Sequence, residues 1–415
     1  MKSERVTTTL GSLLSLSNGK TSPERSNNLP YPVYGGNGII GFSNEANSNP
    51  GTIIIGRVGS YCGSVHFSDS SCWVTDNAIR AKAMNGNDPR FLFYMLQTLH
   101  LNNYRAGSGQ PLLNQTILSQ ISATIPAPSE QRRIAYILST LDDKIELNRQ
   151  MNETLESTAR AIFKSWFMNF DPVKAKMEGR IPACMDTETA ALFSSAFQDS
   201  PLGKIPAGWE VGTLGDLSHQ PQYGYTASAK DEIVGPKFLR ITDINKQAWV
   251  DWSSVPYCEI TDKEIDKYRL YKGDVLIARM ADPGHGVVIE ENQEAVFASY
   301  LIRFRPILDQ YARFLQYWLR SNSYWELVKG REIGTTRASL NAKTLSGFPL
   351  VIPPLEIVEI FSSQISNLRD RIVANTSETE SLATLRDTLL PKLLSGEIRV
   401  DDAVEILEET DGEKS

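Results

Sequence analysis

The sequence predicts an α+β protein with an internal repeat, in which two similar α/β domains are joined by two long antiparallel helices that form a coiled-coil spacer. Three observations support this prediction. The 415-residue chain carries two sets of matching motifs. Each set begins with short β-branched runs and Gly-rich turns, which indicate a compact domain containing strands. Each set ends in a Gly-free stretch of about forty residues with apolar positions spaced by four and three, as in a coiled coil.

The repeat consists of short motifs that recur at a nearly constant offset. The stretch GTIIIGR at residues 51–57 recurs as GDVLIAR at residues 273–279, which is 222 residues later. Beyond residue 107 the offset is 227, so the Leu-Asn pair at 113–114 matches the pair at 340–341. Solenoid repeats have periods of about 20 to 50 residues. The longer period therefore indicates two copies of one module.

The repeat divides the chain into six expected segments. These are the first domain at 1–127, its spacer helix at 128–170, a linker at 171–204, the second domain at 205–353, its spacer helix at 354–397 and an acidic tail at 398–415. The linker contains several prolines and one short predicted helix near 187–197. Residues 401–415 carry seven acidic residues and one Lys, so a solvated tail holds most of the chain's net charge of −7.

Polar residues interrupt the apolar seam of each predicted helix at its midpoint. The first seam contains Ile134, Leu138, Leu141, Ile145, Asn148, Asn152, Leu155, Ala159, Ile162 and Trp166, and adding 227 to each number gives the second seam. Equivalent helices packed antiparallel meet at their midpoints. We therefore expect Asn148 and Asn375 to face each other with hydrogen-bonded amides that set the register. Alternatively, both amides are solvated.

Signatures of catalysis are missing from the sequence. The Gly19-Lys20-Thr21 triplet ends like a phosphate-binding loop, but Leu14 stands where the first Gly of that motif belongs. The four histidines lack metal-ligand spacing, and no nucleophile elbow or NPPY-type methyltransferase motif is present. No metal and no bound cofactor are therefore expected. A duplicated domain presents two similar surfaces, which favours double-stranded DNA as the target, while a protein partner stays possible.

Cysteine content and hydropathy bear on location. Four cysteines are few for this length, so the thiols are expected to be ordinary core residues in a reducing cytoplasm. No stretch approaches the ~20 apolar residues of a membrane helix. We therefore expect a cytoplasmic protein without a membrane partner.

Several long stretches of the chain resemble one family. Residues 129–173 resemble the central region, and residues 385–398 the distal region, of the specificity subunits of type I restriction-modification systems. The stretch IPAGWE at 205–210 is similar to the opening of their second recognition domain, and PVYGGNGIIG at 32–41 adds to the likeness. The resemblance covers nearly the whole chain.

The resemblance implies a role in DNA recognition. Such a subunit carries two target recognition domains, each of which reads half of a bipartite DNA site, and is not catalytic itself. Two modification subunits would bring S-adenosylmethionine and adenine-N6 methylation, and restriction subunits would add ATP- and Mg-dependent translocation and cleavage in anti-phage defence. Two other classes of protein stay as alternatives. One is an enzyme, a self-contained adenine methyltransferase or nuclease, and the other is a coiled-coil adaptor that binds only proteins.

Candidate DNA-binding residues lie in turns at matching positions of the two copies. Side chains of Arg, Lys, Asn and Gln pair with base edges, whereas hydroxyl groups mostly contact phosphate. The candidates are Lys20, Arg57, Ser108 and Gln110 in the first copy, and Tyr223, Tyr225, Lys230, Arg279, Thr335, Thr336 and Arg337 in the second. Gln110 and Arg337 differ where specificity would differ. The alternative is a solvated turn for the loop residues, and a structural ion pair for Arg57 and Arg279.

Three aromatic residues follow the first predicted helix. Trp166, Phe167 and Phe170 are candidates for a docking surface for a modification subunit. Aromatic side chains are more often part of the protein's own core, which is the alternative.

Overall fold

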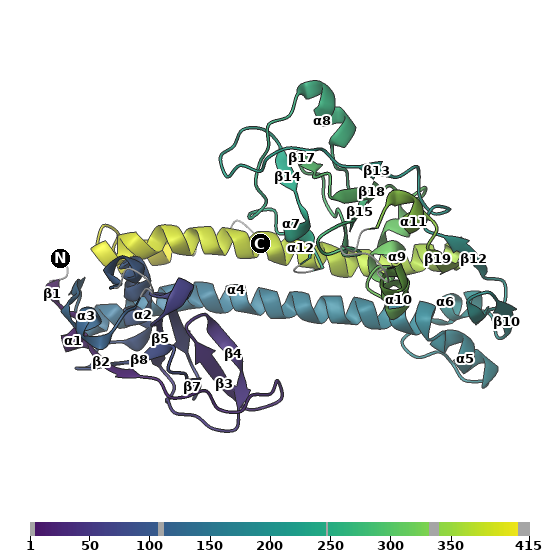
Figure 1. Cartoon of the computed structure of the whole chain (residues 1–415). Helices are drawn as coiled ribbons and strands as arrows, with labels where there is room; N and C mark the ends of the chain where they lie inside the picture. The colour runs from purple at the N-terminus through teal and green to yellow at the C-terminus, as the bar shows by residue number, and fades with distance from the viewer. Residues whose placement is uncertain (1–4, 107–111, 246–247, 332–339, 406–415) are drawn as a thin grey trace. The chain divides into compact units, whose positions relative to one another are not determined.

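The computed structural model describes residues 5–106, 112–245, 248–331 and 340–405 (Figure 1). It divides into two compact units. Unit 1 comprises residues 1–146 and 381–415, and unit 2 comprises residues 147–380. Each unit contains one mixed α/β domain and a stretch of each of two long helices, α4 (Pro128–Phe163) and α12 (Leu355–Ser395).

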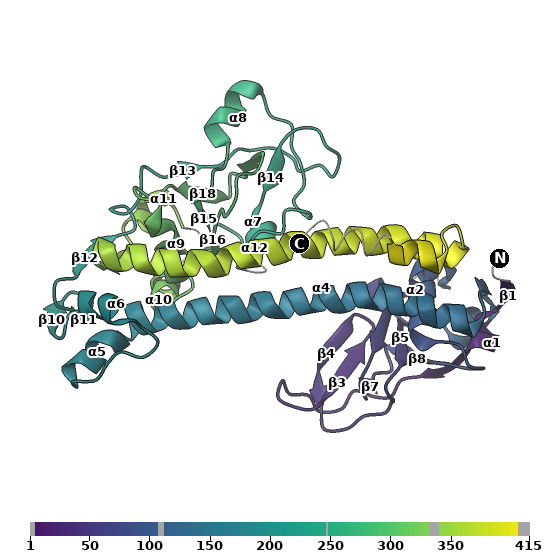
Figure 2. The same cartoon turned by 180° about the vertical axis from the view of Figure 1, so that it is seen from behind.

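The domain of unit 1 is built on a four-stranded antiparallel sheet in the order β2-β8-β5-β6. Its strands are β2 (Leu14–Asn18), β8 (Ala78–Ala83), β5 (Thr52–Gly56) and β6 (Val65–Ser68). The central strand β5 is buried along its length because its sequence, TIIIG, is largely apolar. A second sheet contains β4 (Gly38–Ser43), β3 (Tyr31–Gly35) and β7 (Trp73–Val74), and Figure 2 shows it from behind. A further antiparallel pair contains β1 (Val6–Thr9) and β9 (Ser122–Ile125).

Helices close the core of unit 1. Helix α2 (Pro89–Thr98) begins where the Asp88 side chain accepts a 2.9 Å hydrogen bond from the Phe91 N–H, and Pro89 occupies a favourable first-turn position. The core joins α2 and the sheet to the predicted seam residues Ile134, Leu138 and Leu141 of α4 and Leu389 and Leu393 of α12. Short helical elements complete the domain: α1 (Leu10–Leu13), Gly59–Tyr61, Leu101–Tyr104 and α3 (Gln115–Gln120).

Unit 2 repeats this topology. Its four-stranded antiparallel sheet has the order β13-β18-β15-β16, and a terminal antiparallel pair, β12·β19, corresponds to β1·β9. The strands are β12 (Glu210–Thr213), β13 (Gln222–Tyr223), β14 (Lys237–Leu239), β15 (Val275–Ala278), β16 (Gly286–Val288), β17 (Ala295–Phe297), β18 (Leu301–Phe304) and β19 (Pro349–Ile352). The helices of this domain are α7 (Ile241–Ile244), α8 (Asp262–Tyr268), α9 (Gln310–Trp318), α10 (Asn322–Arg331) and α11 (Ala342–Ser346). The predicted α+β repeat is confirmed.

The repeated Leu-Asn pair anchors and caps a helix in both units. Leu113 and Leu340 are buried, with 0% and 2% of their surface exposed. The Asn114 side chain accepts a 2.8 Å hydrogen bond from the Ile117 N–H at the start of α3. Asn341 does the same at 2.8 Å for the Thr344 N–H of α11. An Asn in this position satisfies one of the free N–H groups of a helix N-terminus.

Within unit 2, α4 and α12 pack antiparallel. Asn148 lies against Asn375 and Glu156 against Arg369, so residue numbers fall along α12 as they rise along α4. Asn148 and Asn375 are both 1% exposed, which agrees with the expectation that they face each other. The two side-chain amides do not bond to each other, however, so the expectation of a bond between them is corrected. The Asn148 Nδ2 lies 3.5 Å from the backbone oxygen of Asn375, while the Asn375 amide donates to Asn152.

The segment after α4 is more ordered than the linker we expected. A π-helical turn at Lys164–Met168 leads into α5 (Asp171–Met177), in which Pro172 takes a first-turn position that favours a helix. The predicted short helix is α6 (Thr187–Leu192), and a hairpin of β10 (Phe197–Ser200) and β11 (Gly203–Pro206) follows.

Three of the four thiols are buried, as expected of core residues, but Cys184 is exposed. All four cysteines are free. Among the described residues, no helix combines the length and the apolar character needed to cross a membrane.

Candidate nucleic-acid interface

An arginine directly follows the matching central strand in each unit. Arg57 follows β5, where its N–H donates to the Asn77 oxygen at 2.9 Å and its oxygen accepts from the Leu113 N–H at 2.9 Å. Arg279 follows β15 with the same pattern, donating to Tyr300 at 2.9 Å and accepting from Leu340 at 2.8 Å. The backbone of both arginines is thus fixed between the residue that precedes a neighbouring strand, β8 or β18, and the Leu-Asn pair that starts a short helix.

The guanidinium groups of these two arginines share one unusual property. In each, the Nε atom is buried and has no hydrogen-bond partner among the described residues. Among the described residues, neither arginine forms the ion pair that was the alternative to a DNA contact. A buried donor without an acceptor costs about 1–3 kcal/mol. Each arginine as a whole is only partly buried, so the accessible part of its side chain is open to an acceptor such as a phosphate or a base oxygen.

Tyr223 joins Arg279 in unit 2. The guanidinium carbon of Arg279 lies 4.9 Å from the centre of the Tyr223 ring. The Tyr223 hydroxyl accepts a 3.0 Å hydrogen bond from the Ala342 N–H at the start of α11. Because Tyr223 is 40% exposed, the pair forms a partly open cationic and aromatic surface at this strand end.

Lys20 and Tyr225 occupy equivalent positions. Each follows a Gly whose backbone passes close to another backbone segment, where a side chain would not fit. A Cβ atom on Gly19 would lie 2.0 Å from the Thr75 oxygen, and one on Gly224 would lie 2.3 Å from the Ala298 oxygen. Lys20 is exposed and lines a groove of about 990 Å³. Tyr225 instead packs on Tyr268, with ring centres 5.3 Å apart. Of the two, Lys20 is the more accessible to a ligand.

Lys230 has a structural partner. Its Nζ lies 2.6 Å from a Glu259 carboxylate oxygen, and its backbone pairs with Tyr257. This ion pair offsets the charge that a phosphate contact would use. The environment of Lys230 therefore favours a structural role over a contact with DNA.

Five of the predicted DNA-binding residues lie outside the described residues. They are Ser108, Gln110, Thr335, Thr336 and Arg337. The described residues that flank them are informative. Ala106 and Leu112 exchange backbone hydrogen bonds of 2.9 and 3.0 Å, and the next residue, Leu113, bonds to Arg57. In unit 2, Leu340 bonds to Arg279 in the same way. In both units, therefore, the described leucine of the Leu-Asn pair is bonded to the arginine that follows the central strand.

The aromatic residues after α4 belong to the core of unit 2. Trp166 and Phe167 are 4% and 5% exposed, and Phe167 packs edge-on against Phe361 with ring centres 4.9 Å apart. Phe170 packs on Trp209 at 5.6 Å. The predicted docking surface is therefore corrected for Trp166 and Phe167, because buried rings that fill the protein's own core offer no free surface to a modification subunit. Phe170 is partly buried against the same core, and its docking role stays a prediction.

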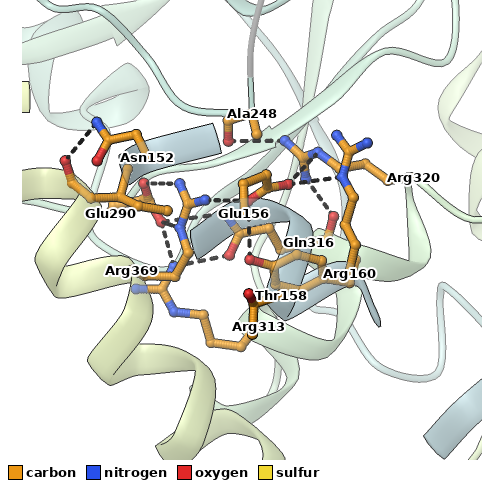
Figure 3. A network of polar contacts seen from close by, with 12 residues as sticks. Asn152, Glu156, Thr158, Arg160, Ala248, Glu290, Arg313, Gln316, Arg320 and Arg369 are labelled. Carbon is orange, nitrogen blue, oxygen red and sulfur yellow. Dashed lines mark hydrogen bonds and ion pairs between the residues drawn. The ribbon is translucent and has the colours of Figure 1, made fainter. Parts of the chain in front are cut away.

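A buried ionic network, which sequence reasoning missed, fixes the domain of unit 2 to the helix pair (Figure 3). Arg369 of α12 is fully buried and bonds to Glu156 of α4 at 2.6 Å and to Glu290 at 2.5 and 2.6 Å. Burial alone would raise the pKa of Glu290, but the hydrogen bonds and charges of Arg369 and Arg313 bring it below its usual value. The carboxylate therefore stays ionised. In the described part of the chain, no group of three or more His, Cys, Asp or Glu could hold a metal ion.

Comparisons with known proteins agree with this architecture. The family model described as "Type I restriction modification DNA specificity domain" matches residues 2–157 and 206–380. The HindI specificity subunit of Haemophilus influenzae is 28% identical over 359 residues, covering 75% of this chain and 77% of the relative. The MjaIX specificity subunit of Methanocaldococcus jannaschii is 29% identical over 336 residues, covering 75% and 69%.

A solved structure shares the fold. The S subunit of a type I restriction-modification system from M. genitalium matches with a TM-score of 0.63 and 16% identity, over 94% of this chain and 96% of that one. The family model is matched twice, once by each copy of the repeat, and the two matches together cover most of the sequence. The chain therefore belongs to the family of type I restriction-modification DNA specificity domains.

Proposed function

We propose that this chain is the DNA specificity subunit of a type I restriction-modification complex, in which each domain reads one half of a bipartite DNA target. One observation carries the proposal for the site. Each central strand is followed by an arginine that is only partly buried and whose Nε lacks a partner within the described residues, so the two copies offer matching cations to DNA.

The subunit itself performs no catalysis and directs the chemistry of its partners. We propose that it binds double-stranded DNA together with two modification subunits and with restriction subunits. S-adenosylmethionine, ATP and Mg would be bound by those partners. Within this chain, Glu156 and Glu290 are held by Arg369 inside the core of unit 2 rather than presented to solvent, which fits a structural role for these two carboxylates.

The proposal is tested with the purified complex of this chain and its modification subunits. We expect sequence-specific DNA binding and adenine methylation by the complex, and neither activity from the modification subunits alone. Replacing both Arg57 and Arg279 with Ala should weaken binding. Loss of binding with an unchanged subunit assembly, measured by native mass spectrometry, would support the site. Unchanged affinity of the double variant would contradict it.

The same preparation separates the two alternatives. A self-contained methyltransferase would transfer methyl groups from S-adenosylmethionine with this chain alone. A protein-binding adaptor would leave the assembled complex without DNA affinity. Either result would contradict the proposed function.

A further inference from the structure

Unit 1 connects its domain to both long helices through three polar side chains. Tyr94 of α2 donates a 2.5 Å hydrogen bond to the Asp142 carboxylate of α4. Arg386 of α12 donates to the same carboxylate at 2.6 Å. We call Tyr94, Asp142 and Arg386 the first joint.

Unit 2 contains the same chemistry. Tyr317 of α9, which matches Tyr94 in the repeat, lies 3.2 Å from the Glu156 carboxylate of α4. Arg369 of α12 donates to that carboxylate at 2.6 Å (Figure 3). We call Tyr317, Glu156 and Arg369 the second joint. In both joints the carboxylate belongs to α4 and the arginine to α12.

This arrangement breaks the symmetry of the repeat. Two interchangeable helices would carry the same residue types at matching positions. Instead, Asp142 of α4 matches Arg369 of α12, 227 residues later, so the same position is acidic in one copy and basic in the other. Each helix therefore has the charge that complements the other helix and repels a copy of itself.

Pairing of like helices would place like charges together. If two α12 helices met in the observed antiparallel register, Arg369 of one would approach the turn that holds Arg386 of the other. Glu156 would be absent from such a pair. The network would then hold one carboxylate, that of Glu290, for three arginines: Arg313, Arg320 and Arg369. Arg369 is 0% exposed and Arg313 is 6% exposed, and an uncompensated buried charge is strongly destabilising. With two α4 helices, Asp142 would lose Arg386 and approach Glu156.

Apolar side chains at the joints differ in size as well. The core of unit 1 receives Leu390 and Leu393 from α12. The matching residues of the first copy are Phe163 and Trp166, which fill the core of unit 2. In a pair of two first halves, the core of unit 1 would have to accept the larger rings. In a pair of two second halves, the core of unit 2 would receive only leucines and would be left with cavities. Overpacking and cavities both destabilise a close-packed core.

We infer that the helix pair recognises unlike partners: the first half of the chain binds the second half, and neither half binds a second copy of itself. Charge and side-chain size support this inference independently. It goes beyond the proposed reading of DNA and does not depend on it, because pairing is measured without DNA.

A cut version of the full chain tests the inference. A site for a specific protease is inserted between Arg180 and Ile181, where Ile181 is 83% exposed, and the folded protein is cleaved there. The cut protein is unfolded in urea, refolded by dilution and analysed by native mass spectrometry. We expect pairs of one first fragment with one second fragment, in about tenfold or greater excess over pairs of identical fragments. Identical pairs at the statistical level, about half of all pairs, would overturn the inference.

A second measurement uses the uncut chain and so does not require the fragments to refold. Asp142→Arg places Arg against Arg386, and Arg386→Asp places Asp against Asp142, so each single variant reproduces a contact of like helices. We expect both to lower the urea midpoint of unfolding, and the double variant to recover most of the loss. The exposed pair Asp199 and Lys204, 3.1 Å apart, serves as the control, in which the same reversals should have little effect. A double variant no more stable than the single ones would refute the role of charge.

Discussion

The side-chain amide of Asn375 donates a 2.9 Å hydrogen bond to the amide oxygen of Asn152, and the two residues are 1% and 3% exposed. The Asn152 amide in turn lies 3.3 Å from the Thr376 hydroxyl, and the Asn148 amide lies 2.9 Å from a Glu378 carboxylate oxygen. The polar residues in the seam therefore form a hydrogen-bonded layer inside unit 2. Such a layer favours one register, because any other leaves a buried amide unpaired.

Removing one amide of this layer should destabilise unit 2. Asn375→Ala leaves the Asn152 oxygen without its donor and opens a small cavity, so we expect a loss of about 1–3 kcal/mol in the free energy of unfolding. The variant with both Asn152 and Asn375 replaced by Leu should recover much of that loss. Urea unfolding followed by circular dichroism measures both. Asn367→Ala, at an exposed site of α12, is the control, and a loss equal to that of Asn375→Ala would contradict the explanation.

Arg57 and Arg279 should behave as equivalent DNA contacts. Each arginine is only partly buried and its Nε lacks a partner among the described residues, so we expect Arg57→Ala and Arg279→Ala to weaken DNA binding by the assembled complex. If the acceptor is a phosphate, the slope of log affinity against log salt should shrink by about 1 for each variant. Titrations at several salt concentrations measure this slope. Arg180→Ala removes an exposed arginine paired with Glu178 and should leave the affinity and the slope unchanged.

Gln110 and Arg337 should determine different blocks of the DNA target. A bidentate contact from Arg to guanine contributes about 1–3 kcal/mol of discrimination, so Arg337→Ala should relax one position of one block. Gln110→Ala should act on the other block. Binding to a library of target variants measures this. An equal loss for all targets would make Arg337 a phosphate contact, and effects of both variants on the same block would contradict the alignment of the repeat.

Acidification should destabilise unit 1 through His66. Burial lowers the pKa of His66, whose Nε2 is buried without a partner among the described residues. Below its unfolded pKa of about 6.5, the unfolded state binds a proton that the folded state resists, so stability falls as the pH decreases through that value. Urea midpoints between pH 7.5 and pH 5.5 measure the effect. His66→Gln should flatten this dependence, while His219→Gln in unit 2 should preserve it.

Periodic features of the fold could be predicted from the sequence, because a 4,3 spacing directly reports the buried face of a helix. Ile134, Leu138 and Ile365 are fully buried, as the seam predicts. The repeated Leu-Asn pair was visible as a motif, but its physical reason, a buried anchor followed by a helix cap, required coordinates.

Contacts between distant polar residues could not be predicted. Glu156, Glu290 and Arg369 are separated by more than seventy residues from one another, and no local pattern marks a charge that will be buried. The one available signal was Arg386, a charge at an apolar seam position, which binds Asp142. The helix α5 was missed because Pro172 also fits a linker, and only its first-turn position distinguishes the two.

We propose that each domain reads its own half of a split DNA target. The most direct measurement maps methylated adenines in cells that carry the modification subunits with this chain, and again after residues 1–125 are replaced by those of a relative. We predict a motif of two short specific blocks around a spacer of arbitrary bases, with the exchange changing one block and leaving the other. A continuous palindromic motif, or an exchange that alters both blocks, would contradict the account.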